Sequence, residues 1–350
     1  MEREIRIENK FIGEKYPCFI VAEMSGNHNM DFERAKEIIR AAAEAGVDAV
    51  KLQTYTADTI TLNSRQPCFY TTSGGLWEGQ TLYSLYKKAY TPWEWQPKLK
   101  ELADELGIIL FSSPFDVTAV DFLEKMNVPA YKIASFEIND TQLLKKVAET
   151  GKPIMISTGI ADIADIDLAV QTCKDAGNEQ IVLLKCTSSY PALYEEMNLA
   201  LIPNMKETFG CSAGLSDHSL GDEVALAAVA MGASVVEKHF TLKRDDGGVD
   251  ADFSMEAEEM KDMVKRIRNV EAAIGKVSYS LTEKQKRQKR FSRSLFVSKP
   301  VKKGELFTAE NIRSVRPGNG LPVKYLEQIL GRKASHDLAY AAPLTWEDIE

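Results

Sequence analysis

Two histidines occupy matching places in successive segments of the chain, His218 in GLSDHS and His239 in EKHFTL, and the sequence contains only four histidines. Imidazole is the commonest side-chain ligand for metals in proteins. Two imidazoles can hold one divalent ion and leave positions open for water and a substrate, as a catalytic metal site requires. The alternative is that each imidazole makes a satisfied hydrogen bond and nothing more. The pairing favours the metal.

Two lysines and three serines form a second candidate group, made of Lys51, Lys132, Ser113, Ser135 and Ser157. Ammonium and hydroxyl groups in fixed positions are donors suited to phosphate and carboxylate groups. An ion pair with an acid such as Glu137 would explain one lysine. Two lysines with three hydroxyls are better explained by a ligand that carries two negative charges.

Lys185 raises a different possibility, a Schiff-base aldolase in which a desolvated lysine attacks a carbonyl. Against it, Lys185 stands inside an apolar run, before CTSSY, and such an enzyme would not need the histidine pair. A non-catalytic sugar-binding protein is a further alternative. The complete set of lysines, acids and histidines disfavours it.

Eight short apolar runs position these residues, and amphipathic stretches of helical period separate the runs. The runs predict strands at 18–24, 49–53, 108–113, 130–135, 153–158, 181–187, 212–217 and 234–240. Strands that are apolar along their length and separated by helices imply a parallel sheet covered on its outer face. Eight such units over about 250 residues predict a (β/α)8 TIM barrel. An open doubly wound sheet is the competitor, but no G-x-G-x-x-G loop follows the first run.

The ends of barrel strands point at one shared site, so the polar residues after each run are expected to converge there. Beyond the groups already named, these include Glu23, Asn27, Gln53, Glu137, Ser188, Tyr190 and Ser216. A long segment rich in Tyr, Trp, Gly and Ser, at 54–92, follows the second run. A connection of this length at the active-site end of a barrel is usually functional, so we expect a lid or a substrate wall.

The chain is predicted to divide into a barrel domain at 1–278, a basic, polar linker at 279–291 and a small domain at 292–350. The net charge of −8 disfavours nucleic acid and anionic membranes as partners, because both attract an excess of Lys and Arg. No apolar run of about 18 residues and no signal-peptide core occurs, which predicts a cytoplasmic protein. The five scattered cysteines form no CxxC pair and are expected to be reduced.

The order of the motifs resembles that of the sialic acid synthase family over the length of the chain. The matching motifs are VAEMSGNHN, VKLQTY, SSPFD, YKIASFE, ISTG, KCTSSYP, GLSDHS, EKHFTL and GGVDADFS. The small domain resembles the antifreeze-like (SAF, β-clip) domain that ends these enzymes. The resemblance implies a transferase that condenses phosphoenolpyruvate with the open-chain aldehyde of an acylamino sugar, giving a nine-carbon 2-keto acid and phosphate.

By motif position, the resemblance implies that His218 and His239 ligate a divalent metal, Mn²⁺ before Mg²⁺ or Co²⁺. It implies that Glu23 and Asp250 hold sugar hydroxyls and assist proton transfer. The implied phosphoenolpyruvate-binding residues are Lys51, Gln53, Ser113, Lys132, Ser135, Glu137, Ser157 and Ser216. The implied sugar-binding residues are Asn27, Ser188, Tyr190 and Arg316. Arg316 matches an arginine that the small domain contributes to the sugar site of the other subunit, which implies a domain-swapped homodimer.

Two departures from the N-acetylneuraminate pattern bear on the sugar. Those enzymes typically have an Asn where this chain has Ser188, and a GSGE motif where it has ASFE at 134–137. Without an Asn amide to bind a sugar hydroxyl, that hydroxyl would be buried unpaired, which costs about 1 to 3 kcal/mol. The change therefore favours a sugar with fewer hydroxyl groups. The segment GLWEGQTLYSLYKKAYTPWEW is similar to the pseudaminic acid synthase branch, whose substrate is 2,4-diacetamido-2,4,6-trideoxy-altrose. Legionaminic and N-acetylneuraminic acid synthases are the alternatives within the family.

Overall fold

The computed structural model describes residues 4–71 and 77–350. Contacts within the chain divide it into two compact units, Met1–Gly275 and Lys276–Glu350, and each is described by itself. The predicted end of the barrel domain, at 278, lies close to this division. Among the described residues, no helix is long and apolar enough to cross a membrane.

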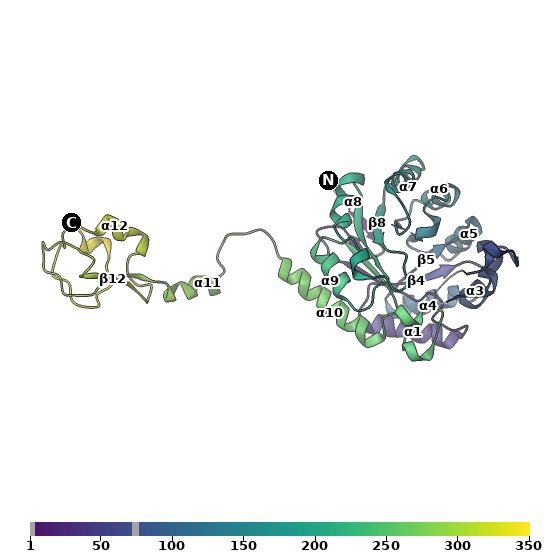
Figure 1. Cartoon of the computed structure of the whole chain (residues 1–350), viewed down its shortest axis with the longest axis horizontal. Coiled ribbons are helices and arrows are strands. Elements are labelled where there is room, and N and C mark those ends of the chain that lie inside the picture. The colour runs from purple at the N-terminus through teal and green to yellow at the C-terminus, as the bar shows by residue number, and fades with distance from the viewer. Residues whose placement is uncertain (1–3, 72–76) are drawn as a thin grey trace. The chain divides into compact units, whose positions relative to one another are not determined.

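Eight parallel strands of the first unit close into a barrel, because β10 pairs with both β9 and β3 (Figure 1). The strands are β3 (Phe19–Glu23), β4 (Ala49–Thr54), β5 (Ile109–Pro114), β6 (Tyr131–Ile133), β7 (Ile154–Ser157), β8 (Ile181–Cys186), β9 (Ser212–Asp217) and β10 (Val235–His239). Each falls within or overlaps one of the eight predicted runs. The TIM barrel is therefore confirmed.

Helices follow the strands and surround the barrel, as Figure 1 shows. They are α1 (Phe32–Ala45), α4 (Gln96–Leu106), α5 (Val117–Lys125), α6 (Thr141–Ala148), α7 (Ile163–Asp175), α8 (Leu201–Phe209), α9 (Glu223–Ala230) and α10 (Ala257–Ile274). Several begin at an aspartate whose carboxylate accepts hydrogen bonds from the first free backbone N–H groups, as Asp31 and Asp162 do. Such a cap is worth about 1 kcal/mol. The sequence thus fixes where these helices start.

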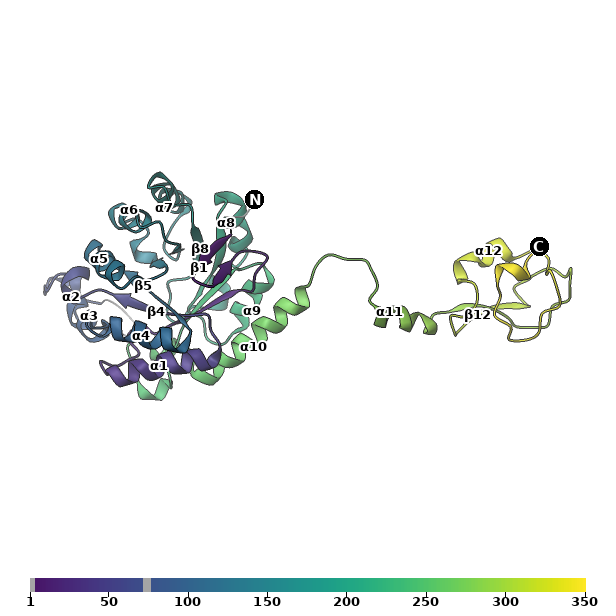
Figure 2. The ribbon, with the colours of Figure 1, turned by 180° about the vertical axis from the view of Figure 1, so that it is seen from behind.

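A hairpin closes the end of the barrel opposite the predicted site. It consists of β1 (Ile5–Ile7) and β2 (Lys10–Ile12), which pair antiparallel and are visible in Figure 2. Ile5, Ile7 and Ile12 are buried in one apolar cluster with inward residues of the strands, such as Phe19 and Phe111. Because this cluster fills the amino-terminal half of the barrel, a ligand can enter only at the carboxyl ends of the strands.

The segment at 54–92 contains α2 (Ala57–Ile60), the short 3-10 helix η1 (Pro67–Phe69) and α3 (Leu82–Ala89). Residues 72–76, which belong to the predicted lid or wall, lie outside the described residues. Trp77 Nε1 donates a hydrogen bond to Val249 O at 2.8 Å. The segment is therefore tied to the loop that follows β10, at the open end of the barrel.

The second unit holds β11 (Ser294–Val297), β12 (Ile312–Val315) and α12 (Leu326–Ile329). The two strands pair antiparallel, and Leu295, Phe307 and Leu344 lie in an apolar cluster of this unit's own. The helix α11 (Glu283–Gln288), which precedes these strands, is exposed.

Candidate active site

One cavity of about 430 Å³ lies at the carboxyl ends of the barrel strands. Its polar lining consists of Glu23, Lys51, Gln53, Thr71, Ser113, Lys132, Ser135, Glu137, Ser157, Cys186, Ser216, His218, Glu237, His239 and Asp250. Its apolar and aromatic lining includes Tyr55, Ile60, Trp77, Leu82, Leu85, Tyr86, Ala89, Phe115, Tyr190 and Val249. Most of the predicted site residues are therefore brought together, and a wall from the 54–92 segment faces them.

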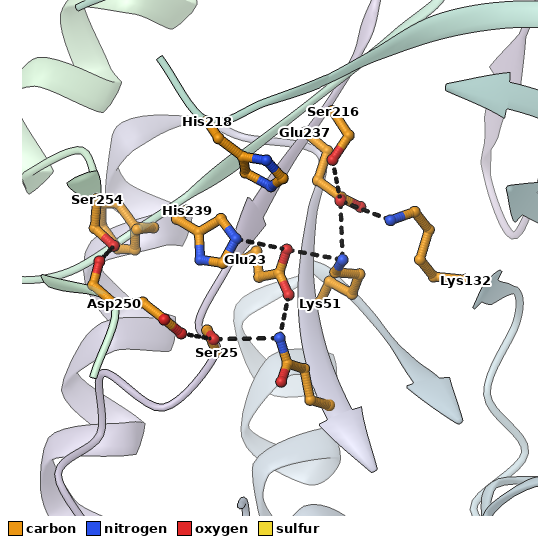
Figure 3. A network of polar contacts seen from close by, with 12 residues as sticks. Glu23, Ser25, Lys51, Lys132, Ser216, His218, Glu237, His239, Asp250 and Ser254 are labelled. Carbon is orange, nitrogen blue, oxygen red and sulfur yellow. Dashed lines mark hydrogen bonds and ion pairs between the residues drawn. The ribbon is translucent and has the colours of Figure 1, made fainter. Parts of the chain in front are cut away.

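Glu237 gathers the two predicted lysines at the floor of the cavity (Figure 3). Its Oε1 accepts hydrogen bonds from Lys51 Nζ, Lys132 Nζ and Ser216 Oγ, each at 2.9 Å. Lys51 Nζ also lies 2.8 Å from Glu23 Oε2. The acid that both lysines share is thus Glu237, with Glu23 as a second partner of Lys51, and neither lysine pairs with Glu137. Glu237 stands two residues before His239, and side chains alternate along a strand, so both side chains point into the barrel. This spacing was the signal in the sequence that indicated Glu237 as a site residue.

The floor stays charged although it is buried. Burial opposes charge on Lys51, but the carboxylates of Glu23 and Glu237 outweigh it and raise the pKa of Lys51. Burial also opposes charge on Glu23, but Lys51 lowers the pKa of Glu23 well below its usual range. For Lys132, burial is the stronger influence and lowers the pKa. The floor therefore presents ammonium and carboxylate groups side by side.

Three oxygens at the floor are buried without a hydrogen-bond partner: Ser113 Oγ, Ser157 Oγ and Glu237 Oε2. Buried polar groups in proteins are almost always paired, so each such atom needs an explanation. The two hydroxyls are free to donate, and two ammonium groups lie at the same floor. The arrangement is suited to the oxygens of an anionic ligand.

The two histidines meet in the cavity with their ring centroids 5.2 Å apart. His218 Nδ1 lies 2.9 Å from Thr187 O, so it donates there and leaves Nε2 free. His239 Nε2 lies 3.4 Å from Glu23 Oε2, and its Nδ1 is buried without a partner. Burial lowers the pKa of His239 to about 3, which keeps the ring in the neutral form that binds metals.

These features fit a divalent metal held by the histidine pair. The described residues contain no group of three or more His, Cys, Asp or Glu side chains arranged to hold an ion. Two imidazoles, one with an unpartnered nitrogen, would therefore supply the protein's main ligands, and water and substrate would fill the other positions.

A chain of polar contacts joins the floor to Asp250. Gln53 Nε2 donates to Glu23 Oε1 at 2.7 Å and to Ser25 Oγ at 3.2 Å, and Ser25 Oγ donates to Asp250 Oδ2 (Figure 3). Burial, with the nearby charge of Glu23, raises the pKa of Asp250 to about 6. One carboxylate thus stays ionised while a second titrates near neutrality, which is a usual arrangement for acid–base chemistry.

The sequence comparisons assign the chain to a known family. The model of the NeuB family matches residues 38–279, more than half of the chain, and the model of the SAF domain matches residues 292–350. The chain belongs to the NeuB family. The predicted resemblance to the sialic acid synthases is therefore confirmed, as is a fold that combines a TIM barrel with a carboxyl-terminal SAF domain.

Individual NeuB-family relatives match nearly the whole chain. The pseudaminic acid synthase of Campylobacter jejuni is 45% identical over 332 residues, which cover 95% of this chain and 96% of that protein. The N,N'-diacetyllegionaminic acid synthase of Legionella pneumophila is 36% identical over 343 residues, covering 97% and 96%. Among solved structures, the spore coat polysaccharide biosynthesis protein SpsE of Bacillus subtilis aligns with a TM-score of 0.68 at 34% identity, covering 99% of both chains.

Three predicted sugar-binding residues lie outside the lining of the cavity. The Asn27 amide is buried and donates to Phe240 O and Ser254 Oγ, so it holds the loop after β3 in place. Ser188 Oγ is buried without a partner, and it lies beside Gly159. Arg316 is an exposed residue of the second unit. Of the predicted sugar-binding set, Tyr190 alone lines the cavity.

Lys185 is not placed to form a Schiff base with a ligand in the cavity described above. It is absent from the described lining, and its Nζ donates to Cys186 O and to Thr187 Oγ1. Burial lowers the pKa of Lys185, but the amine is turned toward its own strand end. The structure therefore gives the aldolase alternative no support.

The predicted set did not include Cys186, which lines the cavity at the end of β8. Its Sγ lies 3.8 Å from His218 Nδ1. Burial opposes the thiolate, but His218 outweighs burial and lowers the pKa of Cys186 to about 7. Its place at a strand end was the signal that could have found it. Phe253, whose ring lies 4.9 Å from that of His239, is 14 residues beyond the end of β10, so it did not stand at a strand end.

Proposed function

We propose that the chain is a pseudaminic acid synthase, which condenses phosphoenolpyruvate with 2,4-diacetamido-2,4,6-trideoxy-altrose to give pseudaminic acid and phosphate. The observation that carries the proposal is the division of one cavity into two parts, a hydroxyl-rich floor with two lysines and two histidines, and an apolar, aromatic wall. The floor suits phosphoenolpyruvate, and the wall suits a sugar that carries methyl groups. Family membership and 45% identity to the C. jejuni enzyme support the same pair of substrates.

Phosphoenolpyruvate would bind at the floor through Lys51 and Lys132. Both ammonium groups share Glu237 Oε1, and a phosphate or carboxylate would compete for them. The unpartnered hydroxyls of Ser113 and Ser157 would donate to the same oxygens. Donors fixed on strands need little reorganisation as charge moves during the reaction. The remaining contacts that we propose for this substrate come from Gln53, Ser135, Glu137 and Ser216.

His218 and His239 would hold the divalent metal, and Mn²⁺ is our first choice over Mg²⁺ and Co²⁺. Imidazole together with oxygen ligands from water and substrate suits such first-row ions. When bound, the ion would supply Lewis-acid polarisation of the sugar's aldehyde oxygen. The neutral, buried ring of His239 and the oriented ring of His218 support this assignment.

The remaining chemistry is carried by the protein's acids. C3 of enolpyruvate forms the new bond to the aldehyde carbon, and the aldehyde oxygen takes up a proton. Positive charge that develops at C2 would lie near Glu23 and Glu237, whose pKa values the lysines lower against the effect of burial. Water then adds at C2 and loses a proton, and the phosphate hemiketal collapses to the ketone and free phosphate. Asp250, with a pKa of about 6, is suited to carrying these protons.

The apolar wall favours a deoxygenated, acetylated sugar. The proposed substrate has a C6 methyl group and two acetamido methyl groups, which can pack against Tyr55, Trp77 and Phe115. N-acetylmannosamine would place hydroxyl groups there, and an unpaired hydroxyl costs about 1 to 3 kcal/mol when buried. The legionaminic precursor has similar groups in another configuration. The lower identity to the L. pneumophila enzyme, 36%, makes it our second candidate.

A phosphate-release assay with Mn²⁺ and phosphoenolpyruvate tests the sugar. We expect turnover with the 2,4-diacetamido-altrose and a kcat/KM for N-acetylmannosamine of about one hundredth of that value, since a pocket contact discriminates roughly 10- to 200-fold. The sugar precursor of N,N'-diacetyllegionaminic acid, assayed in the same way, distinguishes the legionaminic alternative. Faster turnover of either competing sugar would overturn the assignment.

We also propose that Arg316 serves the sugar site of the other subunit in a domain-swapped homodimer. The support is the match of residues 292–350 to the SAF domain and the arginine's place in that unit's RPGNG sequence. An exposed guanidinium is free to bind a hydroxylated or anionic ligand.

A further inference from the structure

Behind the histidine pair lies a second, fully buried ion pair that takes no part in lining the cavity. Lys238 Nζ lies 2.8 Å from Asp217 Oδ2, and the two side chains are 2% and 0% exposed. Lys238 Nζ also donates to Ser219 O at 2.6 Å. Neither Lys238 nor Asp217 contributes to the described lining. The chemistry proposed above therefore leaves this pair without a role.

The strand register connects the pair to both histidines. Glu237 lies opposite Ser216, and Lys238 lies opposite Asp217, in the parallel ladder of β9 and β10. Side chains alternate along a strand, so the pair at 217 and 238 points outward, while the residues on either side of it point into the barrel. Each member of the ion pair thus directly precedes one histidine.

The strand β9 ends at Asp217, so the ladder does not hold His218 itself. Beyond the end of the strand, the carboxylate of Asp217 holds the backbone around His218 by accepting hydrogen bonds from Ser219 N at 2.9 Å and Ser219 Oγ at 2.7 Å. Lys238 completes the ring by binding both Asp217 and Ser219 O. The two neighbours of His218 are therefore tied to the neighbour of His239.

A buried ion pair seldom stabilises a fold more than apolar residues of similar size would. Its hydrogen bonds are directional, however, and directional contacts around metal ligands fix the positions of those ligands. We propose that Lys238 is a positioning residue which, through Asp217 and Ser219, fixes the separation of His218 and His239 and so sets the protein's affinity for a divalent ion. The inference rests on the proposed metal site.

Mn²⁺ titration of the metal-free protein, followed by the electron paramagnetic resonance signal of free Mn²⁺, tests this without measuring activity. Lys238→Met should weaken Mn²⁺ binding about 10- to 100-fold, the usual effect of removing a residue that orients metal ligands. The double variant Asp217→Asn/Lys238→Met leaves no unpaired buried charge. Its loss should be close to that of Lys238→Met alone, because residues in one network are not additive.

Tyr131→Phe is the matched control. The Tyr131 hydroxyl donates to Glu124 Oε1 at 2.6 Å, and Tyr131 lies on β6, which is opposite β10 in the strand order of the barrel. This variant loses a polar contact of the barrel layer far from the histidines. Its thermal stability should fall, measured by circular dichroism, while its Mn²⁺ affinity should equal that of the wild type.

Wild-type Mn²⁺ affinity in folded Lys238→Met would overturn the inference. If that variant does not fold, the double variant decides in the same way. If neither folds, Ser219→Ala decides, since loss of one hydrogen bond to Asp217 should weaken binding about two- to tenfold and unchanged binding would contradict the proposal. His239→Ala tests the metal site separately from the role of Lys238, because Mn²⁺ binding that survives this substitution would overturn the metal site itself.

Discussion

Glu137 is a residue at which pH should act directly on the protein. Burial raises its pKa from 4.5 to about 7, and its Oε2 has no partner. Between pH 4.5 and about 7, Glu137 is therefore protonated in the folded protein and ionised in the unfolded chain. The free energy of unfolding should fall as pH rises through this window, by about 1 to 3 kcal/mol, and Glu137→Gln should remove this loss.

Urea unfolding of both proteins at pH 5, 6, 7 and 8 measures the difference. Glu195→Gln, a substitution at an exposed glutamate in the loop after β8, is the control and should leave the pH dependence of the wild type unchanged. A stability difference between wild type and Glu137→Gln that is the same at pH 5 and pH 8 would show that burial does not shift the pKa of Glu137.

For single residues, the sequence predicted which side chains lie at the cavity better than it predicted which side chains they pair with. Lys51, Lys132 and the two histidines were found because they stand at or near strand ends, which converge in any parallel barrel. The pairing of both lysines with Glu237 depends on which side chains reach across the barrel, and no local pattern encodes that distance. Asn27 was expected near the site because it follows a strand, and the resemblance implied a sugar contact; in the structure its amide nitrogen donates to oxygens of the protein itself.

Among the elements, the barrel strands were readable and the hairpin was not. Each barrel strand is buried on both faces and therefore appears as an apolar run. The strands β1 and β2 have only three residues each, and charged residues stand among their few isoleucines. This apolar pattern is too short to predict a strand. The path of the 54–92 segment was also beyond prediction, since its contacts are with residues such as Val249, far along the chain.

Trp77 is the point at which this segment should influence the sugar. Its ring lines the cavity, 5.9 Å from that of Tyr190, while its Nε1 donates to Val249 O beside Asp250. Trp77→Phe keeps an aromatic ring and removes the hydrogen bond. We expect the KM for the sugar to rise about two- to tenfold, in line with one lost hydrogen bond, and the KM for phosphoenolpyruvate to stay unchanged.

Trp93→Phe controls for the loss of an indole hydrogen bond close to the same segment. Trp93 Nε1 donates to Tyr55 O at 3.1 Å, but Trp93 is absent from the cavity lining described above. This variant should retain both KM values. If Trp77→Phe changed neither KM, or raised both equally, the 54–92 segment would not be a wall specific to the sugar.

At the scale of the molecule, the chain consists of two compact units. The barrel unit carries the cavity, the lysines and the histidines, whereas Arg316 lies in the second unit. The first residues of the second unit, at 276–292, are exposed throughout. The sequence predicted such a division from a polar, basic stretch, but a single chain cannot reveal which barrel the second unit serves.

Complementation between inactive subunits tests whether Arg316 acts in the other subunit. Glu23→Ala should inactivate the barrel, and Arg316→Ala should inactivate the sugar contact. If the second unit serves the other barrel, each mixed dimer contains one site with both an intact barrel and an intact arginine. After subunit exchange at equal amounts, half of the dimers are mixed and half of their sites are competent, so phosphate release should recover to about a quarter of the wild-type rate.

Mixing Glu23→Ala with Lys51→Ala is the control, because both lesions lie in the barrel and no arrangement of subunits restores an intact one. Native mass spectrometry of subunits with different tags should show that mixed dimers form in both experiments. When Arg316 acts within its own chain, a mixed dimer pairs one damaged barrel with one barrel that lacks its arginine. Absence of recovery despite mixed dimers would therefore place Arg316 at the site of its own subunit.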